Sequence, residues 1–570
     1  MSTVRRVYFY AVCLVTLVLA AWGAGLLLRL LFDLAIGGRP TFAGPGYANQ
    51  QIALGLSMFT IPAAVWAFHW RTVQRLGGAG TQEAASALRK LYLAVTLAAS
   101  SLTALMTGVT VLRWLLGGAD SQTFSAGAAG AFPVALGVWY YNWRVNSRDG
   151  APSPAGGTLL RWYWYFVAAW SLVLLATGII NTLGIALDHG IFISQPLVQG
   201  PLWSEPLQMR VAAVLLGLAW WSFHWLYAAR DDSSSSLRQV YCYLFAIPGG
   251  ALAAIVSLAI VLFRLLEFLL GVPVGSEPGF FRFLSLTAPT LLVGAAVWTY
   301  HWQRTKEEAS GAAERRSSAR RVYYYLLSGI GLAATSAGVI TLIGLLLDFL
   351  LNSLNPAPLL VISPGWWKDQ LALSVVLLAL GLAAWLLHWL RTQREIDRSE
   401  EERFARSRKV YLYTFLCISI IASVAAAISI AYRLLSGFLL GTVAFDILNS
   451  MKWSLQLLCA AIPALVYHAG LLRYDIRVGA ERTRTVKTIV VVASRTEAGS
   501  LAQRLERALG MPVRAMAYDG PGATEDGKIS EQQVEVLAQA IAASPHSRLV
   551  VLLQGTEIKA YSYEEASRHE

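Results

Sequence analysis

Long apolar runs constrain this chain more than any other feature of its sequence. Runs such as AVCLVTLVLAAWGAGLLL and LALSVVLLALGLAAWLLHWL are about 20 residues long, which is enough for a helix to cross roughly 30 Å of hydrocarbon. Charged residues make up 14% of the chain, whereas a soluble domain contains roughly 25%. The sequence therefore predicts an all-α, polytopic membrane protein.

A short motif opens six of these runs. Its copies read RRVYFY, RKLYLA, RWYWYF, RQVYCY, RRVYYY and RKVYLY, and their aligned tyrosines are Tyr8, Tyr92, Tyr163, Tyr241, Tyr323 and Tyr411. A second apolar run follows each copy and ends W-x-x-[HN]-W in five of them, at Trp66/His69, Trp139/Asn142, Trp221/His224, Trp298/His301 and Trp385/His388. The sixth copy keeps His468 without either tryptophan. A recurring period indicates tandem units, so we expect twelve transmembrane helices in six two-helix repeats.

The repeats set the expected domain boundaries. The six membrane repeats are expected at residues 1–76, 85–148, 157–230, 236–306, 318–396 and 405–475. The first apolar run follows Arg5 and Arg6 as a signal peptide would. Because five internal copies share its pattern, we expect it to remain as a helix.

Positive charge is distributed unevenly among the loops. The five loops between repeats contain 22 Lys and Arg, whereas the six loops inside repeats contain one, Arg39. The positive-inside rule then places both termini in the cytoplasm and the chain in the cytoplasmic (inner) membrane. The same asymmetry accounts for the net charge of +12, so nucleic acid is not an expected partner.

The aligned tyrosines, tryptophans and histidines all fall at the cytoplasmic ends of the predicted helices. Tyr and Trp favour the headgroup level, so we interpret them as an interfacial girdle that contacts anionic headgroups. A histidine there can bond a lipid phosphate, or a tyrosine hydroxyl of its own or a neighbouring repeat. Haem ligation, which needs two imidazoles on one iron, is the alternative for His69, His224, His301, His388 and His468. Asn142 in the same column favours hydrogen bonding. No other cofactor and no metal site is expected, because the four cysteines lie in apolar runs without C-x-x-C spacing.

Charges also recur near the outer ends of the first helices. Arg29 lies 21 residues after Tyr8, or roughly 31 Å along a helix. The corresponding charges are Arg29/Asp33, Arg113, Asp188, Arg264/Glu267, Asp348 and Arg433. We expect the two complete pairs to form within their repeats. We expect the lone charges to pair between adjacent repeats, as Arg113 with Asp188 and Arg433 with Asp348.

The last part of the chain, residues 485–570, has a different composition. TIVVVAS, VRAMAYD, RLVVLLQ and EIKAYSY read as strands, with two amphipathic helices between the first three. This order predicts a small, mainly parallel cytoplasmic α/β domain, and Ser494 with Glu497 fits a capping box. A helix that follows a strand can bind an anion, which makes Ser494, Arg495 and Thr496 candidate anion contacts. Because neither G-x-G-x-x-G nor a Walker loop is present, an interaction or oligomerisation domain is the favoured interpretation.

The repeated R-x-V-Y-x-Y…W-x-x-H-W hairpin, over about residues 1–475, resembles a bacterial membrane-domain family catalogued as domain of unknown function 5671. Asn142 and the sixth copy depart from the pattern. The resemblance implies a prokaryotic inner-membrane protein and carries no reaction.

The expected function is a non-enzymatic one. Coupled transporters usually place a carboxylate or a broken helix near the midplane, and no Asp or Glu of this sequence falls there. We expect an integral membrane scaffold or assembly component with protein partners or a homo-oligomeric state, and a cytoplasmic interaction or sensing domain. A channel or transporter with a path between repeats is the alternative, and a haem-binding redox protein is the second alternative.

Overall fold

The computed structural model describes residues 3–37, 46–77, 81–192, 201–233, 235–272, 277–308, 313–354, 365–398, 400–441, 444–485, 488–518, 529–544, 546, 548–554 and 557–563. The chain divides into two compact units. Unit 1 comprises residues 1–394 and 430–459, and unit 2 comprises residues 395–429 and 460–570. Two helices, α14 and α15, begin in one unit and end in the other.

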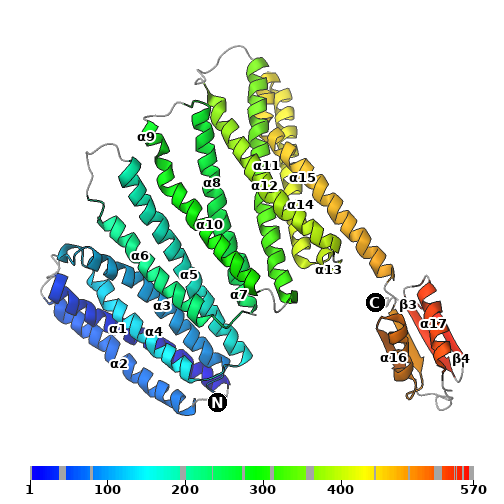
Figure 1. The fold of residues 1–570 in the computed structure, drawn as a ribbon, viewed down its shortest axis with the longest axis horizontal. Coiled ribbons are helices and arrows are strands. Elements are labelled where there is room, and N and C mark those ends of the chain that lie inside the picture. Colours follow the sequence, from blue (N-terminus) through cyan, green and yellow to red (C-terminus); the bar gives the residue numbers. More distant parts are fainter. Residues whose placement is uncertain are drawn as a thin grey trace. The chain divides into compact units, whose positions relative to one another are not determined.

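Helical hairpins make up most of the described chain (Figure 1). The first two consist of α1 (Thr3–Phe32) with α2 (Tyr47–Leu76), and α3 (Ala87–Leu116) with α4 (Ala126–Arg148). The third is α5 (Pro154–Leu187) with α6 (Glu205–Trp221), and the fourth is α7 (Ser236–Val240) and α8 (Ile247–Leu269) with α9 (Glu277–Phe280) and α10 (Leu284–Glu307). The fifth and sixth are α11 (Ala313–Leu354) with α12 (Trp366–Arg398), and α14 (Arg406–Leu440) with α15 (Ala444–Thr485), separated by the short α13 (Glu400–Arg403). The hairpin end with the aligned tyrosines is called the motif end below, and the end with Arg29, Arg113 and Arg264 is called the opposite end.

Short segments of other helical geometry extend or interrupt these helices. Two short 3₁₀ turns, η2 (Ser121–Thr123) and η6 (Phe281–Phe283), precede α4 and α10. The π-helical turns are η1 (Asp33–Gly37), η3 (Asp188–Phe192), η4 (Ser222–Ala228) and η5 (Tyr241–Ala246). The last two contain His224 and Tyr241, so the helices widen where motif residues of the third and fourth hairpins lie. Such turns often mark functional positions.

Eleven of the described helical segments are long and apolar enough to cross a membrane, by length and composition. This count is one fewer than the twelve spans expected from the sequence. The helix outside the count is α4, which has 23 residues and contains Pro133 together with the WYYNWR end of its hairpin. Indole, phenol and amide groups lower its mean hydropathy, although its neighbours are strongly apolar. The chain is a multi-pass membrane protein.

Glycines allow the two helices of a hairpin to approach closely. A Cβ built on Gly250 of α8 would lie 2.7 Å from the carbonyl oxygen of Gly294 in α10, and one on Gly294 would lie 2.8 Å from that of Gly250. Gly217 meets the Leu175 backbone of α5 in the same way. Small residues at such crossings replace the hydrophobic driving force that is missing inside lipid.

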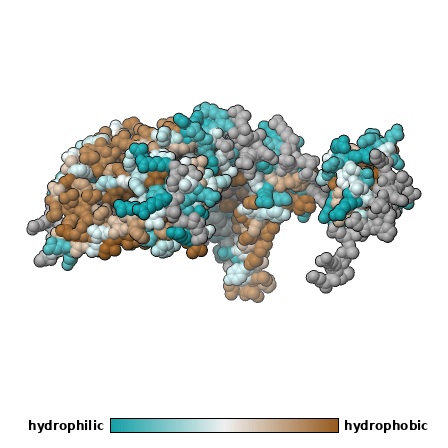
Figure 2. Space-filling view, turned by 90° about the horizontal axis from the view of Figure 1, so that it is seen from below, coloured by the Kyte–Doolittle hydropathy of each residue, from teal (hydrophilic) through white to brown (hydrophobic). Residues whose placement is uncertain are grey.

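Successive hairpins of unit 1 pack against one another in chain order (Figure 1). Helix α1 packs on α4, α3 packs on α5 and α6, and α5 packs on α10. The face of unit 1 seen in Figure 2 carries hydrophilic patches flanked by hydrophobic surface. Large apolar side chains such as Val15, Val18 and Trp22 are exposed on α1, as expected for helices whose outer surface contacts lipid.

Unit 2 contains a small sheet of four strands. They are β1 (Thr488–Ala493), β2 (Val513–Ala517), β3 (Arg548–Gln554) and β4 (Glu557–Ser562), with helices α16 (Ala498–Leu509) and α17 (Glu531–Ala543) between the first three. The sheet order is β2-β1-β3-β4; β1 is parallel to β2 and β3, and β4 is antiparallel to β3. Its core contains Val491, Leu501, Leu505, Ile541 and Val551. The mainly parallel α/β order expected from the sequence is therefore present.

One local prediction in this sheet region was wrong. Helix α16 begins at Ala498, and no side chain caps its N-terminus at Glu497. The Ser494 carbonyl, rather than its hydroxyl, accepts the backbone N–H groups of Glu497 and Ala498. A turn therefore separates Ser494 from the helix, and the capping box lies instead at Ser530 and Gln533 of α17.

Candidate functional site

Each aligned tyrosine described in unit 1 outside the second hairpin lies against the histidine of its own hairpin. The Tyr Oη to His Nε2 distances are 3.2 Å for Tyr8/His69, 2.7 Å for Tyr163/His224, 3.4 Å for Tyr241/His301 and 3.5 Å for Tyr323/His388. In unit 2, the rings of Tyr411 and His468 have centroids 5.7 Å apart. In these five hairpins, the motif residues at the two ends of the hairpin sequence thus meet in space.

The hydrogen bond of the second ring nitrogen, Nδ1, determines the tautomer of these histidines. Nδ1 of His224 lies 2.8 Å from the Trp220 carbonyl oxygen, and Nδ1 of His301 lies 2.8 Å from that of Val297. Because a carbonyl only accepts hydrogen bonds, Nδ1 carries the proton and Nε2 accepts from the tyrosine hydroxyl. Asn142 reproduces the first bond, since its Nδ2 donates to the Val138 carbonyl at 2.8 Å.

A tryptophan from the preceding hairpin donates to the same tyrosine hydroxyl. The Nε1 to Oη distances are 3.3 Å for Trp66/Tyr92, 3.0 Å for Trp139/Tyr163 and 3.2 Å for Trp221/Tyr241. Two continuous chains result, Trp139–Tyr163–His224 and Trp221–Tyr241–His301. Each hydroxyl accepts from one hairpin and donates within the next, so it joins the two hairpins through a buried polar network.

The burial of these tyrosines differs from the predicted interfacial girdle. Tyr8 is 55% exposed, but Tyr92, Tyr163, Tyr241, Tyr323 and Tyr411 are all buried. The motif tryptophans Trp66, Trp139, Trp221, Trp298 and Trp385 are half-buried. The aromatic residues lie between hairpins because their polar tips find protein partners there, and only Tyr8, at the first hairpin, keeps the exposure expected of a girdle.

A carboxylate just beyond the second helix closes each of the first four hairpins at the motif end. In the second and fourth, the partner is the arginine three residues before the aligned tyrosine. Arg89 bonds Asp149 at 2.7 and 2.8 Å, with Lys90 at 2.9 Å, and Arg238 bonds Glu308 at 2.5 and 2.9 Å. The side chains of Arg89 and Lys90 are fully buried. Charges this deep are stable only when they are paired and hydrogen-bonded.

The first and third hairpins use a different arginine for the same purpose. It lies two residues before the aligned tyrosine, and a second tyrosine, two residues after the aligned one, also bonds the carboxylate. The contacts are Arg6 and Tyr10 with Glu83, both at 2.9 Å, and Arg161 and Tyr165 with Asp232, at 2.7 and 2.8 Å. Odd and even hairpins are therefore built differently.

Further contacts join the first hairpin to the second, and the third hairpin to the fourth. Trp70 Nε1 donates to Tyr141 Oη at 2.5 Å, and Trp225 Nε1 donates to Tyr300 Oη at 3.0 Å. These residues occupy equivalent positions, next to the histidine column. Arg89 lies over the Trp70 ring at 5.5 Å and Arg238 over the Trp225 ring at 4.2 Å, within the range of cation–π attraction. The junction of the first and second hairpins and that of the third and fourth therefore share these two contacts.

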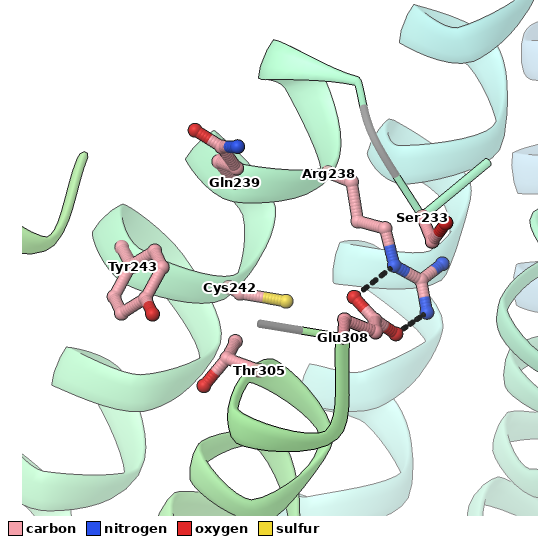
Figure 3. Close-up of a pocket in the computed structure, with 7 residues that line it drawn as sticks. All are labelled: Ser233, Arg238, Gln239, Cys242, Tyr243, Thr305 and Glu308. Atoms are coloured by element: carbon pink, nitrogen blue, oxygen red, sulfur yellow. Dashed lines mark hydrogen bonds and ion pairs between the residues drawn. The ribbon is translucent and has the colours of Figure 1, made fainter. Parts of the chain in front are cut away.

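The cavity around Arg238 and Glu308 is small (Figure 3). Its lining includes Cys242, Thr305 and Gln239, and its volume is about 10 Å³, near the minimum for a single water molecule. The Arg238 guanidinium and the Glu308 carboxylate face each other across it (Figure 3). This site holds two helices together and has no room for an organic substrate.

The histidines have little capacity left for a cofactor in this arrangement. Nε2, the nitrogen that faces away from the helix backbone, accepts from tyrosine in His69, His224, His301 and His388. Ligation of haem iron through Nε2 would require that hydrogen bond to be given up. The Nδ1 atoms are bonded to helix carbonyls, including that of His468 at 2.7 Å from Ala464.

At the opposite end, the lone charges pair between hairpins, but not with the partners that the sequence suggested. Asp188 bonds Arg282 of the fourth hairpin at 2.7 Å rather than Arg113. Arg113 bonds Glu205 of the third hairpin. Asp348 bonds Lys452 of the sixth hairpin rather than Arg433, which is exposed. The prediction considered only charges on first helices, and the partners lie on the second helices or in the loops before them.

The two pairs expected within hairpins are present. Arg264 Nη1 lies 3.0 Å from Glu267, and Arg29 Nε lies 3.6 Å from Asp33. This end also carries more positive charge than the loops alone indicated, because Arg282 and Lys368 lie beside the loops that precede α10 and α12. Arg39 lies outside the described residues.

The candidate anion contacts of unit 2 lie directly after β1. Ser494 is buried, and its Oγ lies 3.2 Å from the Thr496 hydroxyl, whereas Arg495 and Thr496 are exposed. Since β1 pairs with β2 on one side and β3 on the other, these residues lie at the point where the strand order reverses, the usual place for ligands in open α/β sheets.

The comparison with protein families now decides the classification. The model of a domain of unknown function, DUF5671, matches residues 6–141, 161–290, 274–357 and 321–466, which together cover more than half of the chain. The chain belongs to the DUF5671 family. No curated protein and no solved structure matches it.

The boundaries of the DUF5671 matches agree with the contacts at the motif end. Three of the matches begin at Arg6, Arg161 and Arg321, each two residues before the aligned tyrosine of an odd hairpin. Each of these matches continues into the hairpin that follows. The fourth match, residues 274–357, runs instead from the fourth hairpin into the fifth, so every match covers parts of two successive hairpins.

The motif-end carboxylates are the residues that sequence reasoning missed. Asp149, Glu308 and Asp475 each lie seven residues after the Asn or His of their hairpin. In unit 2, Arg408 bonds Asp475 at 2.6 Å, as its counterparts do in unit 1. This constant spacing is a usable signal in the sequence, although Lys and Arg outnumber Asp and Glu in the same loops.

Proposed function

We propose that this DUF5671 protein is a non-enzymatic scaffold of a bacterial inner membrane, with twelve spans in six tandem hairpins, α4 being the twelfth span. The observation that carries the proposal is the polar connection of neighbouring hairpins at the motif end. Trp–Tyr–His chains and cation–π contacts join them, and buried ion pairs close individual hairpins at the same end. A path for solutes between hairpins would require side chains that can separate, whereas these side chains are hydrogen-bonded to one another or stacked on one another.

The proposed orientation places the motif end and both termini in the cytoplasm. Its support is the excess of Lys and Arg in the loops of that end. The proposed partners are anionic headgroups at that face and either another membrane protein or further copies of this chain. The α/β region of unit 2 is proposed to be the interaction or sensing module, with Ser494, Arg495 and Thr496 as its anion contacts.

Thiol labelling tests the orientation. In a chain whose four native cysteines are replaced by Ala or Ser, Gln122→Cys lies in an exposed turn of the opposite end and Arg230→Cys at an exposed position of the motif end. A membrane-impermeant maleimide on intact cells should label the first variant alone, and label the second only after permeabilisation. The reverse pattern would place the motif end outside the cell.

A second experiment tests the scaffold role. The full chain and a chain ending at residue 485 would be purified from native membrane and compared for stoichiometric partners. We expect the full chain to retain partners that the chain ending at residue 485 loses, because residues 486–570 are proposed to bind them. Solute flux in proteoliposomes above that of empty vesicles would favour the channel, and a Soret band in the optical spectrum would favour the haem protein.

A further inference from the structure

A long apolar groove runs between the first and second hairpins, away from the polar contacts of the motif end. It lies between α1, α3 and α4 and has a volume of about 620 Å³, inside the range of roughly 300–1,000 Å³ that is usual for small-molecule sites. Its walls are mostly aliphatic, as in Leu17, Leu26, Val95, Val134 and Val138.

The polar residues in the groove do not make it hydrophilic. Hydroxyls of Thr96, Ser100 and Thr103 bond the carbonyls of Tyr92, Thr96 and Ala99 at 2.9, 2.6 and 2.9 Å, all within α3. Their donors are thus satisfied by the helix that carries them. A hydrocarbon chain in the groove would meet methyl and methylene groups without burying an unsatisfied polar group.

The groove is elongated along α1. Its lining extends from Leu14 to Arg29, a helical rise of about 22 Å. One leaflet of a bilayer has roughly 15 Å of hydrocarbon, half of the full core. The groove is therefore long enough for an extended acyl chain, and Trp22, which is 61% exposed, flanks it.

A single charge stands at one end of the groove. Among the described residues that line it, Arg29 is the charged one, and its side chain is 49% exposed. Its Nε lies 3.6 Å from Asp33, beyond hydrogen-bond length, so the guanidinium retains donors for another partner. Arginine presents these donors in a planar fork that matches the oxygens of a phosphate. The geometry points to a bound anionic phospholipid, with an acyl chain along α1 and the headgroup phosphate at Arg29.

The third and fourth hairpins provide an internal control. A groove of about 440 Å³ lies between α5, α6 and α10, with Leu172, Ala176 and Val297 in its wall. No arginine is among its described lining residues, and Gly184 occupies the position that corresponds to Arg29. The arginine near Gly184, Arg282, lies in a separate hollow and is bonded by Asp188 at 2.7 and 2.8 Å, so headgroup selectivity should be stronger at the first groove. This inference does not depend on the scaffold role, and it concerns the end opposite to the headgroup contacts proposed above.

Native mass spectrometry of the purified full chain tests the inference, with phosphatidylglycerol, phosphatidylcholine and oleate as probes at equal concentration. The wild type should retain one phosphatidylglycerol in preference to phosphatidylcholine by about tenfold, or about 1.4 kcal/mol, because both phosphates can accept from Arg29 but the choline cation is repelled by its guanidinium. Arg29→Gln should lose the preference but keep lipid occupancy. Ala99→Leu, which narrows the groove, should reduce the occupancy by both phospholipids.

Matched controls separate the groove from general surface charge. Arg264→Gln removes a charge of similar exposure, 44%, at the same end of the protein, and should leave the preference unchanged. An unaltered preference in Arg29→Gln, or an equal loss in Arg264→Gln, would overturn the assignment. So would displacement of phosphatidylglycerol by equimolar oleate, since the occupant would then be a single-chain amphiphile.

Discussion

The two ends of the hairpins handle charge in different ways. At the motif end of unit 1, Arg89 and Asp149 are both buried and share their pair with Lys90. At the opposite end, Asp188 is held by Arg282, whose side chain is 61% exposed. The motif end repeats the same residue types in hairpin after hairpin, whereas the opposite end uses a different pair each time. Both ends connect neighbouring hairpins, but the motif end does so through buried tyrosine hydroxyls and tryptophan indoles, and the opposite end through ion pairs with at least one partly exposed partner.

The largest expected effect is the loss of a buried carboxylate at the motif end. Asp149→Asn leaves the fully buried Arg89 and Lys90 with an uncompensated charge, and breaking a buried pair in this way costs about 3–5 kcal/mol. The free energy of unfolding, measured in detergent micelles, should fall by that amount. Asp33→Asn is the control, because its partner Arg29 is half-exposed and 3.6 Å away. Equal losses in the two variants would contradict the proposed difference between the ends.

A smaller effect is expected when a linking hydroxyl is removed. Tyr241→Phe deletes the group that accepts from Trp221 and donates to His301, and leaves the buried Nε2 of His301 without a donor. The expected loss of stability is about 1–3 kcal/mol. Tyr8→Phe removes an equivalent bond to His69 at an exposed position, where water or headgroups replace it, and should cost clearly less. A Tyr8 variant as unstable as the Tyr241 variant would show that burial is not the cause.

The smallest effect is expected at the opposite end. Asp188→Asn breaks a pair with an exposed arginine, and exposed pairs contribute roughly 0–1 kcal/mol that salt screens further. The difference in thermal unfolding temperature between the wild type and the variant should be slight at low ionic strength and should disappear at high ionic strength. A loss of several kcal/mol in the free energy of unfolding that does not depend on salt would mean that this pair contributes to stability as a buried pair does.

The sequence predicted the parts of the fold that depend on periodic patterns. Apolar runs and the recurring tyrosine gave the hairpins, and the strand pattern gave the parallel order of β1, β2 and β3. Of the twelve predicted spans, eleven are long and apolar enough among the described helices; motif position indicates α4 as a span, whereas its hydropathy does not.

The contacts between hairpins were harder to predict, because spacing along one helix says little about the next helix. Asp188 and Arg282 are 94 residues apart, and Lys452 and Asp348 are 104 apart. The rotation of each helix about its own axis determines which of several nearby charges form a pair, and this rotation is set by the packing of the helices. The sequence is compatible with a histidine that bonds a tyrosine hydroxyl and with one that bonds a lipid phosphate, and nothing in one sequence distinguishes the two.

A double-mutant cycle tests the central claim most directly. Trp221→Phe and Tyr241→Phe would be combined and compared with Arg282→Gln and Asp188→Asn, each pair linking two hairpins. The account predicts a coupling free energy of about 1 kcal/mol or more at the motif end, and a value within about 0.5 kcal/mol of zero at the opposite end. Additive effects of Trp221→Phe and Tyr241→Phe, with strong coupling between Arg282 and Asp188, would contradict it.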